Sequence, residues 1–157
     1  MLPDDLAGRR GVVAKTEGSE YGLFASDWHP SFYVFLDGAY REVKSARQLE
    51  PGRWQHLAGV YDGAEVRLYV DGLLAGRAEA SGLRKRNPHP LIVGGDVDGN
   101  GRANSGMSGL LDEVRLSSAA RYAGSEITPL PRHVEDADTL LLLHFDGASG
   151  PFIRDAS

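Results

Sequence analysis

Cysteine is absent from this chain of 157 residues. Its absence excludes disulfide bonds, catalytic thiolates and metal sites built on thiolates. Long apolar runs are also missing, and the longest, TLLLLHF at 139–145, has only the length of a strand. Neither the apolar core of a signal peptide nor a membrane-spanning run is present. We therefore expect no membrane insertion, and we expect any export signal to lie outside this chain.

Net positive charge is lacking as well. The formal net charge is −5 and the sequence pI is about 5.5, so the chain has no general attraction for nucleic acid or an anionic membrane. One basic cluster, RKRNPH at 84–89, departs from this balance. Short charged runs of this kind are usually solvated loops, and we expect a loop here. Nucleic acid is not an expected partner.

What the chain does contain is typical of a compact domain. Hydrophobic residues make up 41% and charged residues 25%, which is too apolar for intrinsic disorder. The length suits a single domain over 1–157 with a sizeable core. The 20 glycines and 8 prolines are spread along the chain, which favours many short strands joined by turns.

The clearest local pattern is a hairpin within 54–72. Val66, Leu68 and Val70 alternate with polar or amphipathic residues, as expected for a strand with one buried face. Asp-Gly pairs at 62–63 and 71–72 bound this strand, and Asp-Gly suits tight hairpins because a type I′ turn needs positive φ at both central residues. The same pair recurs at 37–38 and 146–147.

About ten short strands are expected along the chain. The first begins at Gly11, after an opening segment that has a turn-like composition. The segment 119–124 is compatible with a short helical turn, and 127–133 with an extended crossing segment. Since no segment carries a long helical period, the pattern predicts an all-β protein with two antiparallel sheets, a β-sandwich or jelly roll.

Three motifs in order carry a resemblance to a known family: GRWQHLAGVYDGAEVRLYVDGLLAG, then LIVGG, then GLLDEVRLSSAARY. Together they resemble the laminin G-like jelly roll of the concanavalin A-like lectin and glucanase group, from about Gly11 to Tyr122. The resemblance implies a sandwich that serves as a non-catalytic module binding carbohydrate or protein, often within larger secreted or surface proteins. We therefore expect an extracellular or cell-surface location.

Two departures from the family pattern concern the chain ends. Family members usually begin with a Trp-bearing strand ahead of the segment that starts here at Gly11, and this chain has no equivalent. The C-terminal stretch from Thr139 onward is instead similar to the opening of such a unit. We expect the chain to be a fragment of a larger or tandem-repeat protein, with its last strand covering a sheet edge.

The loop GGDVDGNGRANSG is the strongest candidate site. Asp96, Asp98 and Asn100 alternate as oxygen donors, and Ca²⁺ takes about six to eight oxygens. An EF-hand does not fit, because Met107 stands where the bidentate Glu belongs.

The loop more closely resembles the calcium loop of the pentraxins, which share this type of sandwich. That resemblance implies Asp96 and Asp98 as side-chain ligands with the Val97 carbonyl between them, and Asn100 and Asn104 completing the shell. A plain turn is the alternative interpretation, since Asp, Asn and Gly also favour turn geometry.

Aromatic residues are the candidates for sugar contact, because sugar rings pack on aromatic faces. Trp28 in a loop and Tyr40 after the Asp37-Gly38 turn are expected on a rim, with Asn104 as a polar neighbour, although each aromatic also suits a structural role. Trp54 matches a family core position and is expected to be packed.

Catalytic patterns find little support. Asp112 and Glu113 are adjacent, so on a strand they point to opposite faces and cannot readily flank one bond. The Glu-x-Asp-x-x-Glu strand of the related glucanases is absent, as are a Gly-x-Ser-x-Gly elbow and a His-Glu-x-x-His motif. His56 and His144 are expected to be satisfied structural residues within strands.

The sequence therefore predicts a recognition module for carbohydrate or glycoprotein, with calcium as its candidate cofactor and other domains of the parent chain as further partners. A structural or protein-interaction repeat of a surface or virion protein is the alternative, and a trimmed glycan-active enzyme is the remote one.

Overall fold

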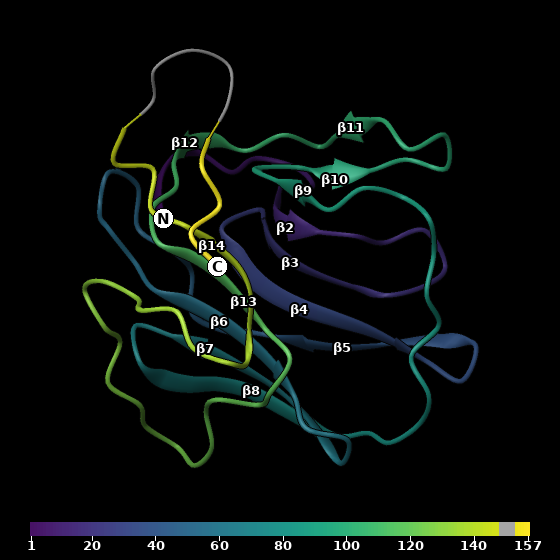
Figure 1. The fold of residues 1–157 in the computed structure, drawn as a ribbon. Coiled ribbons are helices and arrows are strands. Elements are labelled where there is room, and N and C mark those ends of the chain that lie inside the picture. The colour runs from purple at the N-terminus through teal and green to yellow at the C-terminus, as the bar shows by residue number, and fades with distance from the viewer. Residues whose placement is uncertain (148–152) are drawn as a thin grey trace.

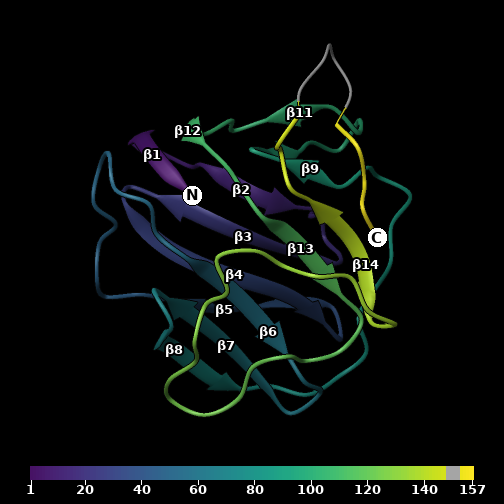
Figure 2. The ribbon, with the colours of Figure 1, turned by 60° about the vertical axis from the view of Figure 1, so that its left-hand side comes forward.

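The computed structural model describes residues 1–147 and 153–157, and strands dominate it (Figures 1 and 2). No helix occurs in those residues, so the all-β prediction is confirmed. None of them forms a helix long and apolar enough to cross a membrane. The strands are β1 (Leu2–Asp5), β2 (Gly11–Ala14), β3 (Tyr21–Ser26), β4 (His29–Leu36), β5 (Ala39–Lys44), β6 (Leu57–Tyr61), β7 (Glu65–Val70), β8 (Leu73–Glu79), β9 (Ile92–Val93), β10 (Asp96–Val97), β11 (Ala103–Asn104), β12 (Ser108–Leu110), β13 (Val114–Ser117) and β14 (Thr139–Leu143).

Two larger sheets form the sandwich. One has five strands in the order β5-β4-β3-β2-β9, and the other has three in the order β6-β7-β8. Antiparallel pairs β1-β12, β10-β11 and β13-β14 complete the molecule. Figures 1 and 2 both draw the β13-β14 pair on the β6 side of the three-stranded sheet, and the pair is a separate two-stranded sheet.

The core between the sheets follows from strand alternation. Phe32, Val34 and Leu36 of β4 are buried together with Val66 and Leu68 of β7. These β7 residues are the ones that the sequence pattern assigns to the inner face, so that prediction is confirmed.

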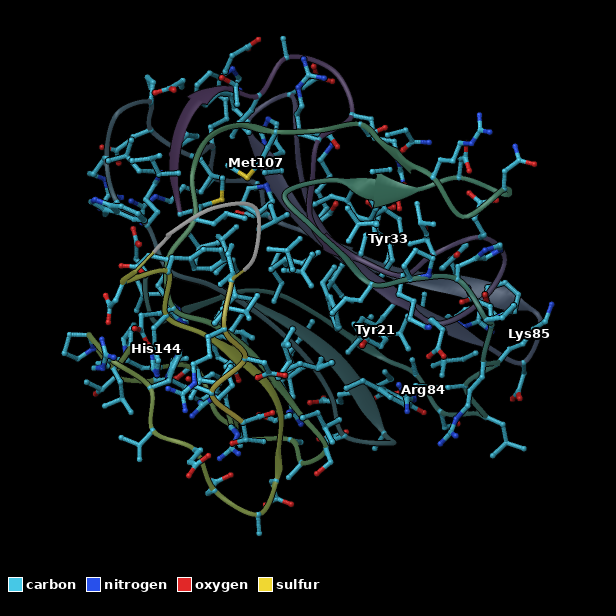
Figure 3. The ribbon with its side chains drawn as sticks, turned by 45° about the horizontal axis from the view of Figure 1, so that its top comes forward. Tyr21, Tyr33, Arg84, Lys85, Met107 and His144 are labelled. Carbon is cyan, nitrogen blue, oxygen red and sulfur yellow. The ribbon has the colours of Figure 1, made fainter. Side chains whose placement is uncertain are left out.

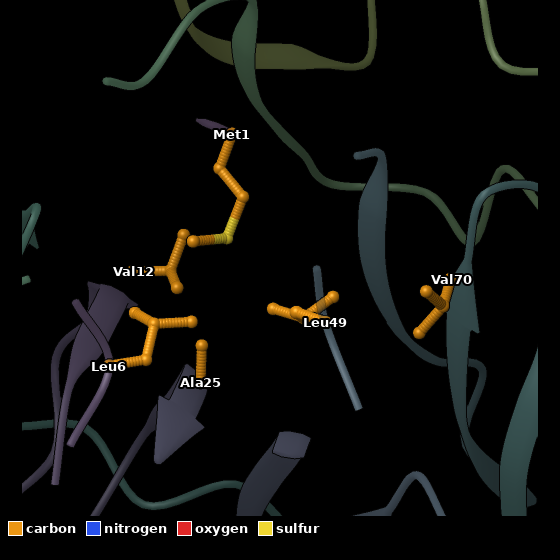
Figure 4. Close-up of a cluster of buried hydrophobic side chains, with 6 residues drawn as sticks. All are labelled: Met1, Leu6, Val12, Ala25, Leu49 and Val70. Carbon is orange, nitrogen blue, oxygen red and sulfur yellow. The ribbon is translucent and has the colours of Figure 1, made fainter. Parts of the chain in front are cut away.

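A second apolar cluster lies toward the opposite end of the sandwich. It consists of Met1, Leu6, Val12, Ala25, Leu49 and Val70 (Figure 4). Trp28 and Met107 pack against it from the outside. The two clusters together give the domain an apolar interior along its length.

The Asp-Gly pairs behave as hairpin turns at two of the predicted positions. Asp37 and Gly38 have φ values of 47° and 91°, and Asp71 and Gly72 have 50° and 83°, as a type I′ turn requires. Between β6 and β7 the loop differs, because only Gly63 of the pair has positive φ. There the Asp62 carboxylate accepts hydrogen bonds from the Ala64 and Glu65 backbone N–H groups at 2.9 and 2.8 Å.

The segment 118–138 crosses the outer face of the three-stranded sheet. The Tyr69 hydroxyl donates to the Gly124 carbonyl at 3.0 Å, and the Ile127 N–H donates to the Gly72 carbonyl at 2.8 Å. This cover leaves the Tyr69 side chain fully buried although it points away from the core. The extended crossing segment is as expected, but the helical turn at 119–124 is wrong, because the Tyr122 and Gly124 carbonyls accept hydrogen bonds from the Arg67 and Tyr69 side chains of β7.

The opening segment also differs from expectation. Residues 2–5 form β1, which pairs with β12 across more than a hundred positions of sequence. Such a strand depends on a distant partner and carries no local alternation, so composition alone makes it resemble a turn.

Candidate functional site

Aromatic side chains gather on the outer face of the five-stranded sheet, opposite to the core. Phe24 and Tyr33 meet edge to face with ring centroids 5.4 Å apart, and Tyr33 and Tyr40 meet in the same way at 6.1 Å. Phe35 lies at the end of this row, with its ring centroid 4.9 Å from that of Tyr40. Edge-to-face contacts of this kind fix the orientation of each ring. Tyr33 and Tyr40 are partly exposed, whereas the two phenylalanines are buried.

The Tyr40 hydroxyl is anchored to a neighbouring loop. It donates to the Ser19 carbonyl at 3.0 Å and accepts the Ser19 N–H at 3.3 Å. Burial raises the pKa of Tyr40 above its usual value, and the Asp96 and Glu17 carboxylates contribute in the same direction. The ring is therefore neutral at ordinary pH and held in one position.

An ion pair occupies the side of this aromatic row next to the β10–β11 hairpin. The Arg9 guanidinium donates to Asp96 Oδ2 through Nε at 3.3 Å and through a terminal nitrogen at 2.9 Å. The other oxygen, Asp96 Oδ1, accepts from the Thr16 hydroxyl at 2.6 Å and from the Val97 N–H at 2.9 Å. The guanidinium also lies 4.0 Å from the centre of the Phe24 ring. Arg9 thus stacks on the Phe24 ring and forms an ion pair with Asp96, and half of its side chain remains exposed.

These groups line a surface depression of about 370 Å³, which we call the tyrosine depression. Its lining residues are Arg9, Thr16, Glu17, Gly18, Tyr33, Tyr40, Asp96, Asn104 and Ser105. In Figure 3, Tyr33 lies on the side of the molecule that carries the β10–β11 hairpin, and His144 lies on the opposite side. Aromatic faces beside a few placed polar groups are the usual composition of a sugar or small-molecule site.

Three of the sequence-predicted site residues meet in this depression: Tyr40, Asn104 and Asp96. Sequence analysis missed Tyr33, Glu17 and Arg9. For Tyr33 a pattern was available, because it alternates with buried residues on β4 and must share the outer face with the residues across the Asp37-Gly38 turn. Nothing near Arg9 in the sequence indicates that it contacts Asp96.

Trp28 lies elsewhere. It occupies the tight turn between β3 and β4 with φ of 67°, and it packs against the second core cluster. Tyr40 pairs with Phe35 near the far end of β4, so the two aromatic candidates stand at opposite ends of that strand. The structure does not bring them into one rim.

The expected calcium ligands are divided between the interior and the hairpin turn. Asp96 is 4% exposed and both its oxygens are hydrogen-bonded within the protein, and the Val97 side chain is fully buried beside it. Asp98 Oδ1 accepts the backbone N–H groups of Asn100 and Arg102 at 2.8 and 2.9 Å. These two bonds lower the pKa of Asp98, that from Arg102 first.

Asp98 therefore has a turn-forming role in the structure, and Asp96 is the least available of the expected ligands. Within 1–147 and 153–157 no three Asp, Glu or His side chains converge as a metal site would require. Calcium binding by Asp96, Val97, Asp98 and Asn100 stays a prediction.

A second, larger depression of about 840 Å³ lies at the β6–β7 turn. Of its three lining carboxylates, Asp62 and Glu65 pair with Arg67, whose side chain is 11% exposed, and Glu79 is exposed to solvent. Asp62 and Glu65, neutralised by the same arginine, lack the separate environments that acid and base catalysis need.

Glu113, one of the two adjacent carboxylates considered for catalysis, joins distant segments. Its Oε1 pairs with His144 Nδ1 at 2.7 Å, and its Oε2 accepts the His133 N–H at 2.7 Å. Burial raises the pKa of Glu113, but the His133 N–H and the His144 ring outweigh it and lower the pKa overall. Glu113 precedes β13 and ties that strand to β14 and to the 118–138 segment.

Two expectations about single residues are wrong. Trp54 is 48% exposed because the buried, hydrogen-bonded Gln55 takes the inward position and β6 begins only at Leu57. His56 is not a satisfied structural residue, since its Nδ1 is buried without a hydrogen-bond partner among the described residues. His144, by contrast, is satisfied by Glu113.

The geometry defines a β-sandwich of the lectin-like class with an aromatic depression on one sheet. A sequence model of the concanavalin A-like lectin/glucanases superfamily matches residues 1–125, and the chain belongs to this superfamily. The match begins ahead of Gly11 and includes β1. No curated protein is significantly similar in sequence.

Among solved structures, the chain is similar to part of an S-layer domain-containing protein from Clostridium thermocellum. The two share 19% identity with a TM-score of 0.41, over 78% of this chain and 62% of the other. This chain thus matches less than two thirds of the length of that structure.

Proposed function

We propose that the chain is a non-catalytic module that binds carbohydrate or the glycan of a glycoprotein in the tyrosine depression. The observation that carries the proposal is the convergence of Tyr33 and Tyr40 with the amide of Asn104 and the guanidinium of Arg9. A sugar ring presents an apolar face to the tyrosines and hydroxyls to the polar groups.

Rigidity supports the same function. The tyrosine rings are oriented by edge-to-face contacts, and Arg9 is held by Asp96 and by the Phe24 ring. A site that is formed before the ligand arrives loses little conformational entropy on binding. An extracellular location, where glycans are displayed, is part of the proposal.

The test is binding of wild-type protein to a broad glycan array, followed by calorimetry with the best oligosaccharide. Asn104→Ala should weaken binding about tenfold, as expected when a polar contact worth about 1.4 kcal/mol is lost. The matched control is Asn100→Ala, which removes an exposed amide from the same hairpin outside the depression and should leave affinity unchanged. Equal affinity of both variants and wild type would place the glycan elsewhere.

A protein partner is the second candidate, and exposed apolar side chains favour it. Trp54, Leu73 and Leu130 are 48, 50 and 51% exposed. Trp54→Ala should leave glycan binding intact, since this side chain is not part of the tyrosine depression. Absence of any glycan binding by the wild type would make this second candidate the better one.

A further inference from the structure

We propose that the tyrosine depression selects uncharged sugars over acidic ones, and that Glu17 is the selecting residue. This inference rests on the proposed function, because it specifies the class of glycan that the same site accepts. It follows from the charges that line the depression and from which of them are already neutralised.

The lining contains three charged side chains: Arg9, Asp96 and Glu17. The first two neutralise each other, since Arg9 makes two hydrogen bonds to one oxygen of Asp96. The other oxygen of Asp96 is used by Thr16 and the Val97 N–H. A ligand carboxylate would compete with Asp96 for the guanidinium, and that competition would leave a carboxylate that is 4% exposed without its counter-ion.

Glu17 differs from Asp96 because it is exposed and makes no ion pair within the described part of the chain. Lys15, two positions earlier, directs its amine to the His89 carbonyl at 2.5 Å. A Cβ placed on Gly99 would lie 3.5 Å from Glu17 Oε2, so the carboxylate lies beside the β10–β11 turn at the rim of the depression. Among the residues that line the depression, the free negative charge is therefore that of Glu17.

A lone carboxylate at the rim has two effects on a sugar. It accepts hydrogen bonds from two neighbouring hydroxyls, which are stronger than bonds between neutral groups. It also repels a uronate or sulfate group, and the remaining lining groups, Asn104, Ser105 and the tyrosines, carry no charge that would offset this repulsion.

The backbone of Glu17 is held in a defined place. Its φ is 83°, and its carbonyl accepts the Ser19 hydroxyl at 3.1 Å in the loop that also anchors Tyr40. The backbone of Glu17 and the Tyr40 ring are thus held by the same loop. The substitution Glu17→Gln keeps shape and hydrogen bonding while removing only the charge.

The experiment compares neutral oligosaccharides with the same oligosaccharides oxidised at C6 to the carboxylate, at low and at high salt. Wild type should bind the neutral member of each pair about fivefold or more tightly at low salt, with a smaller ratio at high salt because exposed charges are screened. Glu17→Gln should bring the ratio toward one. Glu126→Gln, an exposed carboxylate on the 118–138 segment, is the matched control and should keep the wild-type ratio.

Equal or tighter binding of the oxidised member by wild type would overturn the inference while leaving the proposed function standing. An unchanged ratio in Glu17→Gln would also overturn it. Failure of the wild type to bind any member of the pairs would overturn both, and thermal unfolding of each variant confirms that the fold is intact.

Discussion

At the scale of single residues, Gly59 of β6 has almost no freedom to change. A Cβ at this position would lie 2.3 Å from a carbon of the Phe32 ring, so the two sheets approach closely where β6 crosses β4. Glycine is required here by close approach and not by a positive φ.

Gly59→Ala should therefore lower the free energy of unfolding by about 1–3 kcal/mol, the usual cost of overpacking a core. Urea denaturation of the variant and of Gly147→Ala, where an added Cβ meets no atom within 4 Å, measures the effect. If both substitutions cost the same, the contact with Phe32 is not the cause.

His56 makes the stability of the protein depend on pH. Burial, followed by the charge of His133, lowers the pKa of His56 from 6.5 to about 4. Since the folded pKa lies below the unfolded one, the unfolded chain binds more protons between these values. The contribution of His56 to the free energy of unfolding is therefore fully present above about pH 6.5 and is lost as the pH falls toward 4.

The expected loss is about 2 kcal/mol, after allowance for partial solvent access to the ring. Unfolding free energies of wild type at pH 7.5 and 4.5 measure it. His56→Leu should show a smaller loss, whereas Trp54→Leu, in the same loop without a titrating group, should keep the full dependence. If the unfolding free energy of His56→Leu depends on pH as strongly as that of wild type, other titrating groups cause the effect.

At the scale of elements, the β10–β11 hairpin tests the calcium prediction. A calcium site would raise stability by about 2.7 kcal/mol at a hundredfold excess over Kd, which is a shift of several degrees in Tm. Asp98→Ala would abolish that shift. The turn role of Asp98 instead predicts no response of wild type to calcium or chelator, and a loss of about 1 kcal/mol in Asp98→Ala under both conditions.

Thermal unfolding of both proteins in calcium and in excess chelator distinguishes these outcomes. The two backbone hydrogen bonds to Asp98 already lead us to expect some destabilisation in Asp98→Ala. Only a calcium-dependent difference between wild type and Asp98→Ala supports a metal in this hairpin.

At the scale of the whole molecule, β14 completes the sandwich beyond the region matched by the superfamily model. It pairs with β13, and a register shift between Leu116 and Ser117 leaves Leu140 without a partner. Leu140 is consequently 57% exposed, whereas Leu142 on the same strand is 1% exposed.

Leu142→Ala should cost about 2–5 kcal/mol, as expected when a buried leucine is truncated, and Leu140→Ala should cost almost nothing. Guanidinium denaturation of the two variants measures both losses, and the same Leu→Ala change is made at each position. A small loss for Leu142→Ala would mean that the domain is stable without a tightly packed β14.

Features with a short period or a local cause were predictable from sequence. Alternation in Val66, Leu68 and Val70 determines the inner face of β7, and Asp37-Gly38 and Asp71-Gly72 determine two hairpin turns through their φ preferences. The all-β class follows from the number of such features. Each depends on residues a few positions apart, so the chain itself carries the information.

Only the tertiary structure decided which residues face one another. Whether Arg9 meets Asp96, whether Tyr33 and Tyr40 share a depression with Asn104, and whether Gln55 displaces Trp54 outward depend on sheet stacking and on register between distant strands. The contact of Arg9 with Asp96 and the approach of Asn104 to the tyrosines span tens of residues and leave no periodic trace in the sequence. The sequence thus determined the strands and turns that have a local cause, and long-range packing determined β1 and the candidate site.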